Sequence, residues 1–166
     1  MASALTVPHA VAALLLCVAG VAKLRSPAAA ARAVGVAPAA IRVFAILELG
    51  LGGWALLSAD LTSSALMAAL YAAFAAVTIG LGRRGAPCGC FGSDEAPSSS
   101  IQSTVSAVLA LVSIAGLAAS AHGASWILER PLGTVTVLVM GTAGAVYGTV
   151  LAYSELPLLW RAWSAG

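Results

Sequence analysis

The most specific chemical feature of this sequence is a pair of cysteines separated by one glycine, Cys88-Gly89-Cys90. Two thiols at this spacing can close a small, strained disulfide, because glycine tolerates the backbone angles that such a ring requires. Strain makes a disulfide easier to reduce, which favours thiol–disulfide exchange over a purely structural role. Arg83 and Arg84 precede the pair, and nearby cations favour the thiolate, the reactive form of cysteine. The alternative is that both residues are unreactive loop cysteines.

Two further candidates, Glu48 and Cys17, belong to stretches that are otherwise apolar. Each lies six residues from a basic residue that bounds its stretch, which is ~9 Å along a helix. A carboxylate at that depth can accept a thiol proton as a general base. We therefore predict one site that combines Glu48 and Cys17 with Cys88 and Cys90, in which Cys17 resolves or relays the disulfide. The alternatives are a carboxyl that fixes packing by pairing with Lys23, and a cysteine that acts as a small hydrophobic residue.

The composition determines what kind of elements must position these residues. Charged residues make up 8% of the 166 residues, and the hydrophobic set makes up 61%. A soluble domain has about 25% charged residues, so a soluble globule, a coiled coil and a disordered chain are excluded. The net charge is only +2, and the longest basic run is two residues, which argues against nucleic-acid binding. The sequence therefore predicts an integral membrane protein in contact with the lipid bilayer.

Five stretches are long and apolar enough to cross a bilayer as helices. The first is expected to be a retained span and not a cleaved signal peptide, because no basic residue precedes it. We predict an all-α membrane protein with four core transmembrane helices and a fifth, C-terminal one, forming a single integral membrane domain over residues 1–166. The predicted spans are Ala4–Ala22, Ile41–Ser58, Ala65–Gly82, Ile101–Ala121 and Leu132–Tyr153.

The connections and the small residues give further expectations. Ser26 followed by Pro27 is typical of a helix start, and Gly35 of a helix end, which predicts a short interfacial helix over 27–34. Small residues that recur every four positions favour close helix packing in lipid, although an alanine-rich chain also gives such matches by chance. The candidate packing faces are Ala68, Ala72, Ala76 and Gly80 in the third span and Gly144 with Gly148 in the fifth.

Basic residues predict the orientation of the chain. One side of a five-span arrangement holds seven of the eight basic residues, and the other side holds only Arg130. By the positive-inside rule, the N-terminus lies outside the cytoplasmic (inner) membrane, and the 23–42, 83–100 and C-terminal segments face the cytoplasm. The segment with Cys88 and Cys90 is therefore expected on the cytoplasmic side.

A metal site is a second candidate use of the cysteine pair. Tetrahedral zinc takes four Cys or His ligands and prefers the CxxC spacing to CxC. The two histidines, His9 and His122, are expected to be ordinary interfacial residues at the opposite face, so they do not complete a zinc site with Cys88. Soft Cu(I) needs only two or three thiolates and stays open. We accordingly assign no metal ligands.

The arrangement of these residues resembles the MauE branch of the MauE/DoxX membrane proteins, named for methylamine utilisation. The matching residues are Ala22-Lys23-Leu24 with Ser26-Pro27, Glu48-Leu49-Gly50-Leu51-Gly52, and Cys88-Gly89-Cys90-Phe91-Gly92. The resemblance covers roughly the first 120 residues. The fifth span goes beyond the four-helix core of that family.

The resemblance implies a redox-associated helical bundle that works with a thioredoxin-like or other redox partner in making disulfides of exported proteins. By it, Cys88 and Cys90 would be the exchanging pair. The architecture is similar to that of four-helix quinone-linked thiol oxidoreductases. No definite cofactor follows from this, and a quinone is the possible one. The sequence lacks the second, CxxC-type pair that those quinone-linked enzymes use.

Three functions are compatible with these features. The leading one is a membrane thiol–disulfide redox protein, a possible thiol–disulfide oxidoreductase, and the resemblance puts it in a bacterial cytoplasmic membrane. The second is a non-catalytic membrane subunit that assembles a redox complex, which would not need the CxC pair. The third is soft-metal (copper) handling, which would need a further ligand.

Overall fold

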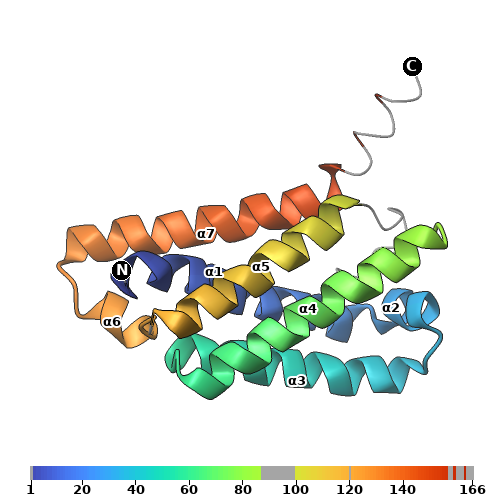
Figure 1. The fold of residues 1–166 in the computed structure, drawn as a ribbon, viewed down its shortest axis with the longest axis horizontal. Helices are drawn as coiled ribbons and strands as arrows, with labels where there is room; N and C mark the ends of the chain where they lie inside the picture. The colour runs from blue at the N-terminus through green and yellow to red at the C-terminus, as the bar shows by residue number, and fades with distance from the viewer. Residues whose placement is uncertain (1, 87–99, 120, 157–158, 160–162, 164–166) are drawn as a thin grey trace.

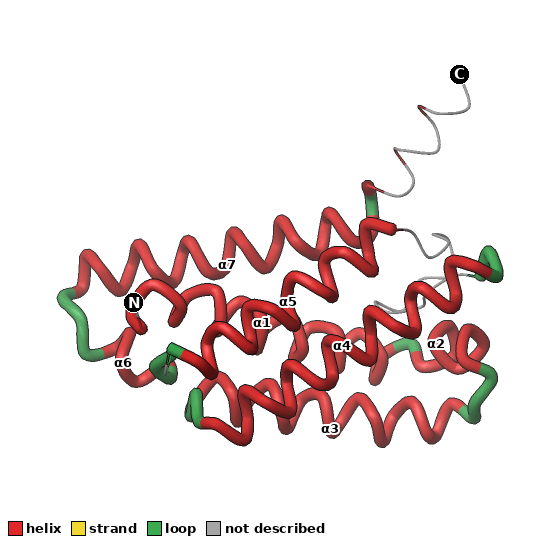
Figure 2. The backbone as a smooth tube through the Cα atoms, in the orientation of Figure 1, coloured by secondary structure: helices red, strands yellow, loops and turns green. Residues whose placement is uncertain are grey.

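The computed structural model describes residues 2–86, 100–119, 121–156, 159 and 163. Over these residues the chain forms helices without strands (Figure 2). The helices are α1 (Ala2–Arg25), α2 (Pro27–Val34), α3 (Pro38–Leu57), α4 (Leu61–Arg83), α5 (Ser100–Ala118), α6 (Ala124–Leu128) and α7 (Leu132–Ser154).

Within the described residues, five helices are long and apolar enough to cross a membrane: α1, α3, α4, α5 and α7. This confirms the all-α membrane fold with four spans and a fifth, C-terminal one. The helices begin or end up to four residues away from the predicted boundaries. The largest such shift is at the start of α4, where Asp60 caps the helix and the polar residues after it still belong to the first turns. The short α6 had no signal in the sequence, because five residues are too few to show a period.

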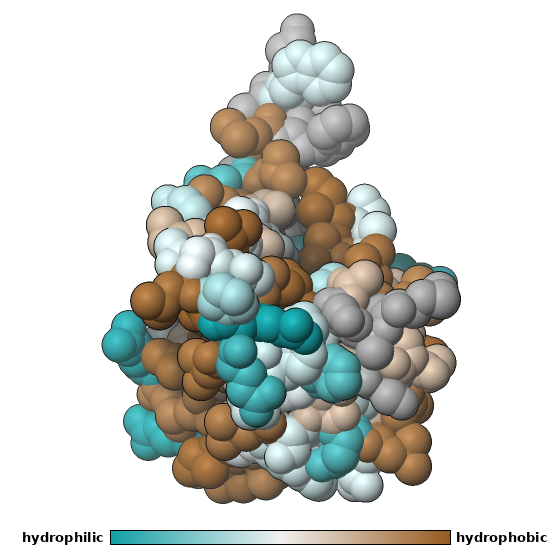
Figure 3. Space-filling view, turned by 90° about the vertical axis from the view of Figure 1, so that its left-hand side faces the viewer, coloured by the Kyte–Doolittle hydropathy of each residue, from teal (hydrophilic) through white to brown (hydrophobic). Residues whose placement is uncertain are grey.

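The long helices alternate in direction along the bundle (Figure 1). The end of α1, the start of α3 and the end of α4 lie at one end of the bundle, together with α2. The N-terminus, α6 and the connection between α3 and α4 lie at the opposite end. We call these the α2 end and the α6 end. Figure 3 looks onto the α6 end, where hydrophilic side chains gather near the centre and hydrophobic ones lie mainly around them.

The bundle is organised around α1. Half of the residues in its apolar window are buried, whereas only 6% are buried in the window of α7. α1 packs most closely on α3, α4 packs most closely on α5, and α7 contacts α1 and α5 only lightly. The main core cluster joins buried residues of α1 to Ala55, Met67, Tyr71 and Leu109. The sides of α1 that do not pack against other helices face lipid, so the helix is apolar all round, which explains why it lacks an amphipathic pattern.

The close approach of α1 and α3 depends on two glycines. A Cβ added at Gly52 would lie 2.7 Å from the Cys17 Sγ and 2.8 Å from the Ala13 carbonyl oxygen. A Cβ at Gly20 would lie 2.9 Å from the Ala45 carbonyl oxygen. The backbones therefore meet where no side chain fits between them, as in other closely packed membrane helices.

Apart from Ala68, the predicted small-residue faces do not pack against other described helices of this chain. A Cβ added at Gly80, Gly144 or Gly148 meets nothing within 4 Å. In α4, Ala68 of the predicted face is buried, but Ala72 and Ala76 are exposed, and the buried residues that follow are Tyr71, Ala75 and Thr78. The physical reason is that a strict four-residue spacing drifts by about 40° per step around a helix of 3.6 residues per turn, so the later alanines of the predicted face turn away from the bundle.

The short helix α2 forms where the sequence predicts it. Pro27 occupies its first turn, and Gly35 ends it with a left-handed φ of 74°. Ser26 lies at the N-cap without making a side-chain cap hydrogen bond. The helix does not lie only at the membrane interface as predicted, because Ala29, Ala30 and Ala31 are buried against the bundle.

Asp60 gives this fold a local dependence on pH. The Ser63 backbone N–H donates to the Asp60 carboxylate at 2.7 Å, and this hydrogen bond lowers the pKa of the carboxyl below its usual value. A depressed folded-state pKa stabilises the protein above the unfolded value of about 4, and the contribution disappears as pH falls through the folded value. Asp60→Asn keeps an acceptor but does not titrate. In detergent, the midpoint temperature of thermal unfolding should therefore decrease less steeply on acidification for Asp60→Asn than for the wild type. Equal slopes of midpoint against pH would contradict this account.

Candidate functional site

Cys88 and Cys90 lie outside the described residues. The description stops at Ala86, two residues before Cys88, and resumes at Ser100. The predicted contacts of this pair with Cys17 and Glu48 therefore stay a prediction.

Glu48 forms a buried ion pair with Lys23. The Lys23 Nζ lies 2.5 Å from the Glu48 Oε1, and the two side chains are 7% and 0% exposed. Lys23 is in the last turn of α1, and Glu48 is in the middle of α3. Of the alternatives that the sequence left open, the pairing with Lys23 is the one seen here. The lysine's long carbon stem lets its ammonium reach inward from the helix end.

The ion pair lies beside two aromatic rings, and one of its carboxylate oxygens makes no hydrogen bond to the described residues. The Lys23 Nζ lies 4.9 Å from the centroid of the Phe74 ring and 5.6 Å from that of Phe44. Such contacts stabilise a cation that has lost its water. The second carboxylate oxygen of Glu48, Oε2, is buried with no hydrogen-bond partner in the described part of the chain. The pair is therefore held through a single oxygen and keeps unused hydrogen-bonding capacity.

Cys17 lies on the same interface between α1 and α3. It is half-buried, and its Sγ faces Gly52, which is one helical turn after Glu48 on α3. The structure thus brings Cys17 and Glu48 to neighbouring positions on one helix seam, on the side of α3 that packs against α1. This agrees with the expectation that both residues face the protein and not lipid.

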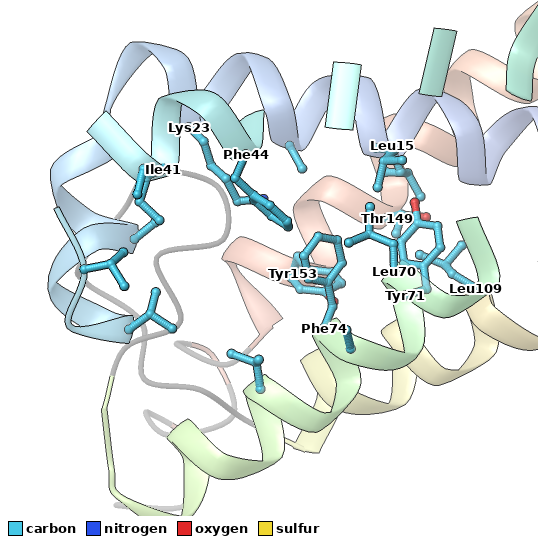
Figure 4. A pocket seen from close by; sticks show the side chains of 18 residues that line it. Leu15, Lys23, Ile41, Phe44, Leu70, Tyr71, Phe74, Leu109, Thr149 and Tyr153 are labelled. Atoms are coloured by element: carbon cyan, nitrogen blue, oxygen red, sulfur yellow. The ribbon is translucent and has the colours of Figure 1, made fainter. Parts of the chain in front are cut away.

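A cavity of about 490 Å³ opens beside the ion pair. Figure 4 shows Lys23, Ile41 and Phe44 at one end of it, Phe74 and Tyr153 in the middle, and Leu15, Tyr71 and Leu109 at the other end. Along α1 it extends from Leu15 to Lys23, which is roughly 12 Å at 1.5 Å per residue. Its walls come from α1, α2, α3, α4, α5 and α7, so that the α1–α3 and α4–α5 pairs face each other across it. The volume is in the range of small-molecule sites.

The hydroxyl groups that line this cavity are engaged with the protein itself. Tyr71 donates to the Ala12 carbonyl oxygen at 2.6 Å, and Thr149 donates to the Ala145 carbonyl oxygen at 2.7 Å. Tyr153 donates to the Gln102 carbonyl oxygen at 2.8 Å and also pairs with the hydroxyl of Ser106. These bonds fix the aromatic walls in place. Sequence reasoning missed the tyrosines, because nothing in the sequence distinguishes a hydroxyl that lines a cavity from one at the membrane surface.

The histidines do not form a metal site with other described residues. His9 is buried and its Nε2 lies 3.3 Å from the Ala55 carbonyl oxygen, which corrects the expectation of an interfacial residue. His122 is exposed and stacks on Trp126 at 5.3 Å. In the described part of the chain, no three His, Cys, Asp or Glu side chains gather closely enough to hold a metal ion.

A comparison with known families supports the resemblance seen in the sequence. The family model described as "Methylamine utilisation protein MauE" matches residues 1–120, which include α1 to α5 and all the candidate site residues. No curated protein and no solved structure matches the chain. α6 and α7 lie beyond the matched region, although α7 contributes Thr149 and Tyr153 to the cavity. Since the match covers well over half of its length, the chain belongs to the MauE family.

Proposed function

We propose that this protein is a membrane thiol–disulfide redox protein that exchanges disulfides with a thioredoxin-like partner through Cys88 and Cys90. In this role it supports disulfide formation or maturation of exported proteins in a bacterial cytoplasmic membrane. The observation that carries the proposal is the Cys88-Gly89-Cys90 pair inside the region that matches the MauE family. An assembly role alone gives no reason for two thiols at this spacing.

The proposed reaction balances as an exchange of one disulfide for another. A thiolate of the pair attacks the partner's disulfide, a mixed disulfide forms, and one partner sulfur leaves as a thiolate. The second cysteine of the pair then attacks the mixed disulfide, which releases the reduced partner and leaves Cys88 and Cys90 joined. The reverse sequence oxidises the partner. In either direction two electrons and two protons move between the proteins.

Glu48 and Cys17 have supporting roles in this proposal. Glu48 would accept the thiol proton, and its Oε2 has no competing donor among the described residues. Cys17 would resolve or relay the disulfide, since it lies on the same seam as Glu48. Both are on helices whose termini share the α2 end with the end of α4, from which the chain continues towards Cys88 (Figure 1).

The direct test uses purified protein in detergent and an oxidised thioredoxin. Cys90→Ser in a Cys17→Ser background should accumulate a mixed disulfide with thioredoxin, because both proposed resolving thiols are missing. Cys88→Ser/Cys90→Ser should exchange no faster than the uncatalysed background. Cys17→Ser tests the supporting role of Cys17, because slowed resolution with normal mixed-disulfide formation would place this residue in the relay. Wild-type exchange rates in the double variant would refute the proposal and favour the non-catalytic assembly subunit. Cu(I) binding that is lost in the double variant, without exchange in the wild type, would favour copper handling.

The orientation of the chain is a separate proposal. Seven of the eight basic residues fall on the side of Cys88 and Cys90, so these thiols should face the cytoplasm. In a Cys17→Ser background, a membrane-impermeant thiol reagent should leave intact cells unlabelled and label the pair only after permeabilisation. Labelling of intact cells would reverse the orientation and leave the thiol chemistry unaffected.

A further inference from the structure

We propose that the cavity beside Lys23 binds a neutral, lipid-soluble carbonyl compound, with its carbonyl oxygen accepting a hydrogen bond from the Lys23 ammonium. The inference concerns a binding site and does not depend on thiol exchange. It follows from three properties of the cavity: the nature of its walls, the one donor that is left for a ligand, and the charge balance around that donor.

The side chains that line the cavity favour a ligand that is mostly apolar. Most of the side chains that line the cavity are aliphatic or aromatic, and Phe44, Phe74 and Tyr71 form part of its length (Figure 4). The cavity lies among helices that are long enough to span a bilayer, so a molecule dissolved in lipid has the nearest access. Its length of roughly 12 Å suits a ring system or a short stretch of chain.

Among the described lining residues, Lys23 is the polar group that keeps a donor for a ligand. The three hydroxyls of Tyr71, Thr149 and Tyr153 already donate to backbone carbonyl oxygens. An ammonium has three N–H groups, and one of them goes to the Glu48 Oε1. Within the described part of the chain, the other two N–H groups have no hydrogen-bond acceptor and lie near the rings of Phe44 and Phe74. A carbonyl oxygen is a better acceptor for an N–H than a ring face is, so it would bind there.

The charge balance selects a neutral ligand over an acid. Glu48 already compensates the charge of Lys23 at 2.5 Å, so the pair is neutral as a unit. A carboxylate ligand would add one uncompensated negative charge to a buried site, at a large desolvation cost. A carbonyl group accepts the hydrogen bond without adding a charge.

The test compares ligands that share a shape but differ in the oxygen atoms. The probes are 2,3-dimethyl-1,4-naphthoquinone, 2,3-dimethylnaphthalene and 2-naphthoate, with binding to purified protein in detergent measured by native mass spectrometry. The quinone should bind about tenfold more tightly than the hydrocarbon, as expected for one hydrogen bond from a charged donor. It should also bind more tightly than the anion. Equal affinity for the quinone and the hydrocarbon, or tightest binding of the naphthoate, would overturn the proposal.

Variants localise the binding. Lys23→Met/Glu48→Gln removes the donor without leaving a lone charge, and it should lower the quinone's advantage over the hydrocarbon to about one. The infrared carbonyl band of ¹³C-labelled quinone should shift to lower frequency in the wild type and not in this variant. Val77→Phe narrows the cavity and should weaken all neutral probes, whereas Ile79→Phe, on the same helix but not in the lining, should not. The site would be refuted if Lys23→Met/Glu48→Gln still bound the quinone more tightly than the hydrocarbon by the wild-type factor. It would also be refuted if Val77→Phe and Ile79→Phe weakened binding of the neutral probes equally.

Two further experiments ask which kind of molecule supplies the carbonyl group and whether binding depends on the thiols. Displacement of the quinone by 1,2-dioctanoylphosphatidylcholine would identify the ester carbonyl of a lipid as the natural group, and resistance to it would identify a quinone-like carbonyl. Cys88→Ser/Cys90→Ser should bind the probes as the wild type does. Failure of exchange with intact binding would therefore refute the proposed function alone, and the opposite result would refute the binding site alone.

Discussion

Replacing Glu48 with Leu should destabilise the protein by about 3–5 kcal/mol, because the Lys23 ammonium would lose the carboxylate that it pairs with while staying buried. The large effect follows from the burial of both side chains, since an exposed pair of the same geometry would contribute far less. The quantity to measure is the free energy of unfolding in detergent micelles, by chemical denaturation.

A second variant separates the charge effect from a packing effect. Lys23→Met/Glu48→Leu removes both charges, and it should recover most of the lost stability because no unpaired ion remains. Glu129→Gln is the control for the loss of a carboxylate at an exposed position, and it should stay close to wild type. A double variant as unstable as Glu48→Leu would show that side-chain packing, and not charge, explains the effect.

Replacing Gly52 with Ala should cost about 1–3 kcal/mol, the usual range for extra atoms forced into a packed interior. The new methyl group would overlap both the Cys17 Sγ and the Ala13 carbonyl oxygen, and the backbone oxygen cannot move aside without moving α1. Gly53→Ala is the matched control on the next residue, where an added Cβ meets nothing. It should be neutral or stabilising, since alanine favours a helix over glycine. Similar unfolding midpoints for the two variants would contradict the close packing of α1 and α3.

The sequence predicted the spans well, because hydropathy and helix length are nearly sufficient to locate a helix in lipid. It also predicted the bounds of α2, where proline and glycine restrict the backbone. Helix packing was harder to predict. The regular small-residue spacing in α4 and α7 suggested close contacts, whereas the contacts occur at Gly20 and Gly52, which show no such repeat.

The candidate site was predicted in part. Placing Glu48 and Cys17 at equal depths required only the rise per residue of a helix, and both do face the α1–α3 seam. The inward reach of Lys23 was a weaker expectation, because a lysine at a helix end can extend towards water equally well. The cavity could not have been predicted, since it depends on Tyr71 and Phe74 of α4 meeting Tyr153 of α7, residues that are far apart in the sequence.

The late position of α7 in the chain has a consequence for biosynthesis. During translation, α1 to α5 are made before Thr149 and Tyr153, so the cavity lacks one of its walls until α7 has been made and inserted. At that stage Ser106, whose hydroxyl pairs with Tyr153 in the finished protein, has not yet met this partner. The last helix to be made therefore completes the wall of the cavity on that side.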